Sequence, residues 1–223
     1  MRDLPYPFAM ASRAVAGFLP SIHGFHFANS WPSAPAFWIG RGYLRLGIGD
    51  ASKGFCGGMS QAVRDRFEQG EAPPPDHVSP APGSPLFDEI ARRQVDSFDR
   101  WVVVPFRFLW MALQPAADRS GATASRVWPA IRAEIDAGHL AMVGLVRSAG
   151  RDPLRNELGH QVVAYRYDET NALVRIGIYD PNHPDDDSVE LVMARGADGS
   201  LALSQSTGEP LVGLLDLPYV RPR

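Results

Sequence analysis

The chain lacks three features that would place it in a familiar class at once: a second cysteine, a long apolar run and an excess of charge. Cys56 is the only cysteine among 223 residues, which excludes an internal disulfide framework, and a thiol that must stay reduced to react suits the cytoplasm. No apolar run approaches the roughly 18 residues that span a bilayer, and residues 1–10 lack the apolar stretch of a signal peptide. The net charge of −3 provides no electrostatic footprint for nucleic acid or an anionic membrane. We therefore expect a cytoplasmic protein that binds neither nucleic acid nor a membrane.

The segment that follows Cys56 has the periodicity of a helix, because apolar residues recur every four positions at Met59, Val63 and Phe67. A thiol in the first turn of a helix lies beside unpaired backbone N–H groups and the positive end of the helix dipole, which favour the reactive thiolate. Gly57 and Gly58 weaken a helix, but they let another backbone or a substrate approach closely. The alternative is a buried free thiol that acts as a small hydrophobe.

The rest of the chain divides into a helical part and a strand part. Residues 1–50 are rich in glycine, proline and aromatic residues, which predicts loops and short strands that wrap the main body. Helices are expected at residues 56–69, 84–100, 108–113 and 127–135, with a proline-rich connection at 71–84 and a polar loop at 120–125. Strands are expected at residues 140–146, 160–167, 173–179, 188–193 and 201–203. This segregation predicts one α+β domain over residues 1–223, in which the mainly helical half (51–138) packs on an antiparallel sheet (139–217).

Two residues of the strand half can complete a reactive site with Cys56. A cysteine nucleophile needs a base, and the base needs a partner that fixes its orientation. His160 opens one expected strand and Asp180 closes the next. Two antiparallel strands joined by a hairpin bring the start of the first beside the end of the second, so these side chains should be neighbours. A serine nucleophile has no such support, because no Gly-x-Ser-x-Gly motif occurs.

These motifs resemble those of the papain-like cysteine peptidases, and most closely their bacterial branch similar to bacteriocin-processing peptidase domains. The matching features, over roughly residues 50–195, are GFCGGM at 54–59, IDAG at 135–138, GHQVV at 159–163 and IYDPN at 178–182. The resemblance implies a papain-like fold in which Cys56 is the nucleophile, His160 the general base and acid, and Asp180 the orienting carboxylate. Asn182 is the alternative for the last role.

One part of that family's pattern is missing here. Papain-like enzymes usually place a glutamine a few residues before the cysteine, where its amide donates to the oxyanion. No glutamine precedes Cys56, and the position six before it is Asp50, which is an acceptor when ionised. Asn29 could supply the amide instead, beside the backbone N–H of Cys56.

The acidic run at residues 180–187 also invites a calcium interpretation. It lacks the glycine and terminal glutamate of an EF-hand loop, so we expect a solvated acidic turn and no metal or other cofactor.

Three functional classes then remain. The favoured one is a cysteine hydrolase that cleaves a peptide or amide substrate through an acyl-enzyme. The others are an acyltransferase that uses the same three residues and a papain-fold binding protein without catalysis.

Overall fold

The computed structural model describes residues 11–39, 46–98, 103–149, 159–196 and 200–222, and within them it contains a seven-stranded antiparallel sheet. The strands are β1 (Ala11–Ala14), β4 (Ala141–Val146), β5 (His160–Glu169), β6 (Leu173–Tyr179), β7 (Glu190–Arg195), β8 (Leu201–Gln205) and β9 (Gly213–Asp216). Their order is β8-β7-β6-β5-β4-β9, and β1 pairs with residues 166–169 of β5, beyond the part that β4 covers. The five predicted strands are confirmed with ends moved by at most two residues, whereas β9 was not predicted.

The helices are α1 (Pro20–His23), α2 (Cys56–Gln69), α3 (Pro85–Ser97), α4 (Val103–Leu113), α5 (Ala116–Ala122) and α6 (Trp128–Asp136), with a 3-10 turn at Ala51–Lys53 and a small separate hairpin of β2 (Phe37–Ile39) and β3 (Leu46–Ile48). Helix α2 ends at Gly70, which adopts the left-handed conformation. The hydroxyl of Ser84 caps α3 by accepting from the Phe87 N–H at 3.3 Å. The predicted end of α2 and the predicted start of α3 are therefore both confirmed.

The prediction of a polar loop at residues 120–125 is wrong, because a π-helical turn at Thr123–Val127 joins α5 to α6 and keeps this segment helical. Thr123 is fully buried, and its hydroxyl accepts a hydrogen bond from the N–H of Leu214 in β9. Tertiary packing therefore outweighs the modest helix propensity of these polar residues. The predicted start of α4 at Phe108 is five residues too late. The helix already begins at Val103, where Val104 packs into the core.

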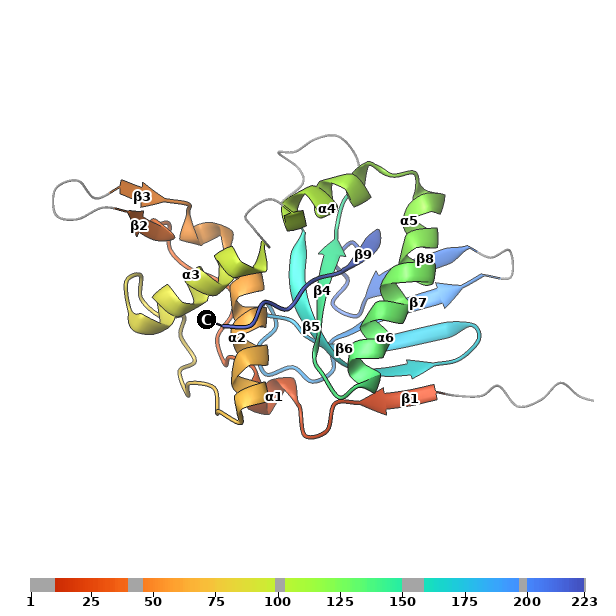
Figure 1. The fold of residues 1–223 in the computed structure, drawn as a ribbon, viewed down its shortest axis with the longest axis horizontal. Coiled ribbons are helices and arrows are strands. Elements are labelled where there is room, and N and C mark those ends of the chain that lie inside the picture. Colours follow the sequence, from red (N-terminus) through yellow and green to blue (C-terminus); the bar gives the residue numbers. More distant parts are fainter. Residues whose placement is uncertain (1–10, 40–45, 99–102, 150–158, 197–199, 223) are drawn as a thin grey trace, which may run out of the picture.

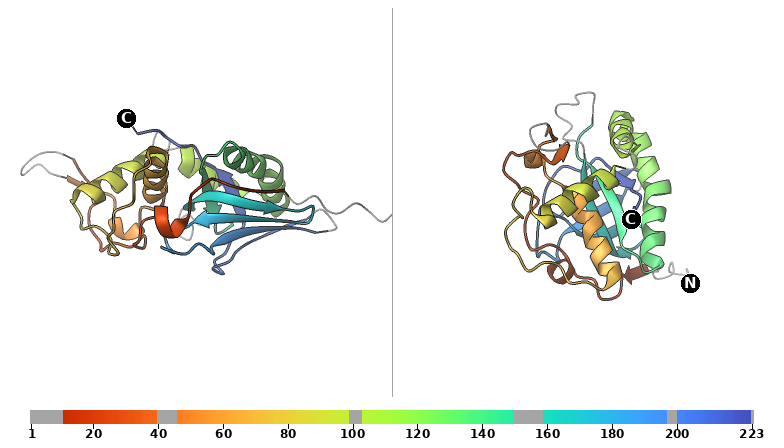
Figure 2. Two further views of the ribbon diagram at one scale, coloured as in Figure 1. Left: turned by 90° about the horizontal axis from the view of Figure 1, so that it is seen from below. Right: turned by 60° about the vertical axis from the view of Figure 1, so that its left-hand side comes forward.

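The elements form an α+β arrangement, as predicted. Figures 1 and 2 show α4, α5 and α6 over one face of the sheet, with α2 and α3 standing at one end of it. Helix α2 contacts both α3 and the start of β5, and the hydroxyl of Ser60 donates to the carbonyl of Gln161 at 3.2 Å. A Cβ at Gly58 would overlap the carbonyl oxygen of Ile90, so the glycine sets how closely α2 and α3 approach. The cysteine-bearing helix is thus wedged between the helical part and the sheet.

A buried charged group ties the C-terminal segment to these two helices. Arg93 of α3 is 1% exposed, and its guanidinium donates to the carboxylate of Asp65 at 2.9 Å and to the carbonyl of Val220 at 2.6 Å. The hydroxyl of Tyr219 donates to the same carboxylate at 2.7 Å. Burial raises the pKa of Asp65, although Tyr219 and Arg93 oppose that shift. These bonds hold residues 219 and 220 against α2 and α3.

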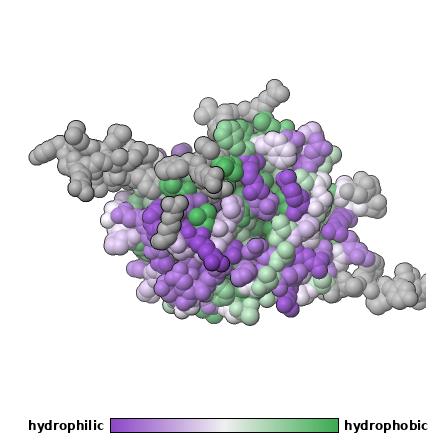
Figure 3. Space-filling model, in the orientation of Figure 1, coloured by the Kyte–Doolittle hydropathy of each residue, from purple (hydrophilic) through white to green (hydrophobic). Residues whose placement is uncertain are grey.

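The outer face of α4 presents a row of apolar side chains to solvent. Val103, Phe106, Trp110 and Leu113 lie three or four residues apart and are 40–65% exposed. Figure 3 shows this apolar surface at the top of the molecule. Among the described residues, no helix is long and apolar enough to cross a membrane.

Candidate active site

The three residues singled out in the sequence come from three different elements that meet at one end of the sheet. Cys56 is the first residue of α2, His160 is the first residue of β5, and Asp180 directly follows the end of β6. Strands β5 and β6 are antiparallel, with Val163 opposite Tyr179, so the start of one lies beside the end of the other. Local sequence sets where each element begins or ends, and strand pairing brings the ends together.

His160 and Asp180 are in direct contact. Nε2 of His160 lies 2.5 Å from Oδ1 of Asp180, and the side chains are 7% and 0% exposed. The same oxygen accepts the backbone N–H of Asn182 at 2.9 Å. Burial alone would raise the pKa of Asp180, but the hydrogen bond and charge of His160, with the Asn182 N–H, lower it below its ordinary value. Asp180 therefore stays ionised and fixes the orientation of the imidazole.

The thiol of Cys56 interacts with the imidazole of His160. Because Asp180 engages Nε2, Nδ1 is the nitrogen left to face the sulfur. Burial would raise the pKa of Cys56, but the hydrogen bond and charge of His160, together with the N–H groups of Gln161 and Gly57, lower it. Burial would lower the pKa of His160, but hydrogen bonds and charges from Asp180 and Cys56 raise it to about 9. The arrangement favours a thiolate beside an imidazolium, and Cys56 as a residue is half-buried.

Asn29 and Asn182 join the loop after β6 to the start of α2. The amide oxygen of Asn29 accepts the N–H of Phe55 at 2.6 Å, and its amide nitrogen donates to Oδ1 of Asn182 at 3.2 Å. The Asn29 N–H also donates to the carbonyl of Pro181 at 2.8 Å. Asn182 thus contacts Asp180 through its backbone, and Asp180 rather than the Asn182 side chain is bonded to the imidazole. Through Asn29, these bonds connect Phe55, the residue before Cys56, to Pro181 and Asn182, the residues after Asp180.

Asp50 occupies the position where the resemblance would place an amide donor. Its carboxylate accepts the N–H of Ser52 at 3.0 Å and caps the 3-10 turn before α2. Its pKa is lowered, chiefly by hydrogen bonds from Ser52, so it is an ionised acceptor. Asp50 therefore shapes the turn that leads to Cys56 and has no proton to donate to an oxyanion.

No family model, curated protein or solved structure matches this chain. The contact between His160 and Asp180 and the interaction of His160 with Cys56 depend on no comparison.

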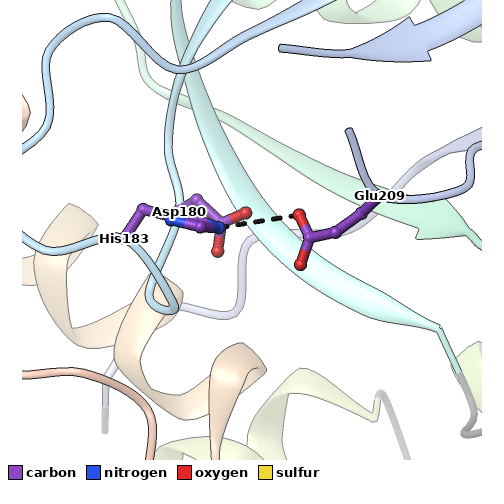
Figure 4. Close-up of side chains that lie close together, drawn as sticks. All are labelled: Asp180, His183 and Glu209. Atoms are coloured by element: carbon purple, nitrogen blue, oxygen red, sulfur yellow. Dashed lines mark ion pairs between the residues drawn. The ribbon is translucent and has the colours of Figure 1, made fainter. Parts of the chain in front are cut away.

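The acidic turn after β6 contributes to a second cluster, drawn in Figure 4. Ligand atoms of Asp180, His183 and Glu209 all lie within 4.8 Å of one another, and Nε2 of His183 is 3.6 Å from Oε2 of Glu209. This is the group within the described ranges that could surround a cation. Both carboxylates already have protein partners, since Arg147 donates to Glu209 at 2.8 Å and His160 contacts Asp180. Protein groups therefore occupy both carboxylates, whereas Nε2 of His183 lies at ion-pair distance from Glu209 and has no hydrogen-bond partner among the described residues.

Sequence reasoning missed Gln205 altogether and gave Gly159, which it named within the GHQVV motif, no structural role. Gln205, the last residue of β8, donates from Nε2 to Oδ2 of Asp180 at 2.9 Å. Gly159 precedes His160 with φ +45°, and a Cβ there would overlap the ring of Phe108 in α4. The glycine was visible in the sequence as a signal for unusual backbone. Gln205 had no such signal, because only strand pairing brings β8 near Asp180.

Proposed function

We propose that this protein is a cysteine hydrolase with a papain-like fold that cleaves a peptide or amide bond through an acyl-enzyme on Cys56. The observation that carries the proposal is that the Cys56 thiol interacts with the imidazole of His160, whose Nε2 contacts the buried carboxylate of Asp180. A merely structural cysteine requires neither a paired imidazole nor partial exposure. Here the thiol has the imidazole of His160 beside it, and Cys56 as a residue is partly exposed.

In the proposed reaction the Cys56 thiolate attacks the carbonyl carbon of the substrate, and the carbonyl oxygen becomes an oxyanion. The imidazolium of His160 then gives its proton to the leaving amine as the C–N bond breaks, which leaves a thioester on Cys56. Neutral His160 next removes a proton from water, and the resulting attack releases the carboxylic acid and restores the thiolate. Asp180 stabilises the imidazolium and keeps Nε2 turned away from the sulfur.

The oxyanion needs donors at the start of α2. The N–H of Cys56 is the first proposed donor, because the initial N–H groups of a helix have no partner within it and lie at the positive end of the helix dipole. Asn29 is the proposed side-chain donor. Its amide nitrogen carries two hydrogens, and Asn182 accepts one of them.

The proposal is tested by acylating the protein with 4-nitrophenyl acetate and following both nitrophenolate release and intact mass. We expect a rapid release of about one equivalent, an acetyl group on Cys56 and its subsequent loss to water. Cys56→Ala should abolish the adduct, and His160→Ala should slow both its formation and its loss. Wild-type acylation no faster than that of free glutathione would refute a catalytic Cys56. Repeating the experiment with an added primary amine identifies acyl transfer, since a transferase would yield the acetylated amine in preference to acetate.

A further inference from the structure

Gln205 is placed where it can control the carboxylate of the proposed site. It is the last residue of β8 and is 4% exposed. Strand β7 separates β8 from β6, yet the Gln205 amide reaches Oδ2 of Asp180 at 2.9 Å. The opposite orientation of the amide would point its oxygen at an ionised carboxylate, so the chemistry requires the nitrogen to face Asp180.

The oxygen of the same amide shows that this position of Gln205 destabilises the folded state. Oε1 of Gln205 is buried and has no hydrogen-bond partner among the described residues. A buried acceptor without a partner destabilises the folded state, and such groups are uncommon in native proteins. A residue chosen only to fill the space at the end of β8 could be apolar and would avoid this cost. The polar end that does have a partner is the one that contacts Asp180.

The bond from Gln205 complements the two bonds on the other carboxylate oxygen. Oδ1 accepts from Asn182 and contacts His160, whereas Oδ2 accepts from Gln205. Donors on both oxygens fix the plane of the carboxylate and stabilise its ionised form. We propose that Gln205 is a positioning residue that keeps Asp180 ionised and turned toward His160, and so sustains the thiolate of Cys56. This inference rests on the proposed function.

A purely structural tie between β8 and the turn after β6 is the competing explanation, and a pH profile separates the two. If Gln205 acts through Asp180, removing its N–H donor raises the pKa of Asp180, weakens the support for the imidazolium and raises the pKa of Cys56. A structural tie would affect stability alone. Within the described part of the chain, the other titratable groups near Asp180 are His160, Tyr179, His183 and Glu209, and they remain unchanged in the variants.

The experiment measures the rate of Cys56 alkylation by iodoacetamide from pH 5 to 9, together with the thermal unfolding midpoint. Gln205→Met keeps the length of the side chain without its donor and should move the acidic limb of the profile up by about one pH unit, which corresponds to about a tenfold lower rate on that limb. Gln205→Asn shortens the amide by one methylene and should shift the profile in the same direction, which provides the test if the methionine variant does not fold. Thr123→Val, the control, removes another buried polar group away from the site and should lower stability without moving the profile.

A double-variant comparison then asks whether Gln205 acts through Asp180. On an Asp180→Asn background, Gln205→Met should reduce the rate by less than about twofold, because the carboxylate that it positions is gone. A wild-type-like profile for both Gln205 variants, or an equal loss on both backgrounds, would overturn the positioning role. If the wild-type profile itself showed an ordinary thiol, the proposed function would fail first. The two failures are therefore distinguishable.

Discussion

Replacing His160 by alanine is the most direct perturbation of the proposed site. The imidazole opposes the effect of burial on Cys56, because burial raises the pKa of the thiol while the hydrogen bond and charge of His160 lower it. Without the ring, the thiol should titrate at or above its ordinary pKa of about 8.5. The variant should therefore lose most of its reactivity on the acidic side of neutrality.

The size of the effect follows from the thiolate fraction. At pH 6 a thiol with a pKa of about 8.5 is roughly 0.3% ionised, so a fully ionised Cys56 would have an advantage of up to about 300-fold. Nucleophilicity falls as the thiol pKa falls, which removes part of that advantage. We expect wild-type alkylation at pH 6 to exceed that of His160→Ala by about tenfold or more. As pH rises through about 9, the wild-type imidazolium loses its proton and the two rates should converge.

The assay is the second-order rate of iodoacetamide labelling at Cys56, followed by intact mass at half-unit steps from pH 5 to 10. His139→Ala is the matched control, because His139 is 54% exposed and belongs to a surface ion pair with Glu68. Its profile should superimpose on that of the wild type. A single wild-type transition at an ordinary thiol pKa, shared by His160→Ala, would refute the ion pair and with it the activated nucleophile.

Two further predictions concern the packing that supports the site, and both are read from the free energy of unfolding in denaturant. Gly58→Ala should destabilise the protein by about 1–3 kcal/mol, because its Cβ would overlap the carbonyl oxygen of Ile90. Gly121→Ala, with open space around it in α5, should be neutral or stabilise by up to about 1 kcal/mol, and equal effects would contradict this reasoning. Arg93→Met should cost about 3–5 kcal/mol, because it leaves a buried carboxylate without its cation. Arg132→Met, at a 41% exposed ion pair, should cost less than about 1 kcal/mol, and a similar loss in both would argue against the buried network.

The sequence by itself determined the elements whose signals are local. The four-residue spacing after Cys56 and the glycine at residue 70 predicted α2, and Ser84 with Pro85 predicted the start of α3. Alternating strands joined by a short turn also placed His160 near Asp180, because hairpin geometry follows directly from chain order. These parts of the site depend on residues close in sequence, where periodicity and capping chemistry are informative.

Only the tertiary structure decided the features that depend on distant pairing. Residues 116–136 stay helical because Thr123 is buried against β9, and β9 itself is placed by its pairing with β4. Gln205 reaches Asp180 because β7 and β8 extend the sheet beyond β6. Single-chain patterns carry no information on which strands become neighbours, so residues brought together by sheet order are not visible in them. The Cys56 helix and the His160–Asp180 hairpin could therefore be predicted from the sequence, whereas the hydrogen bonds that hold the carboxylate in place could not.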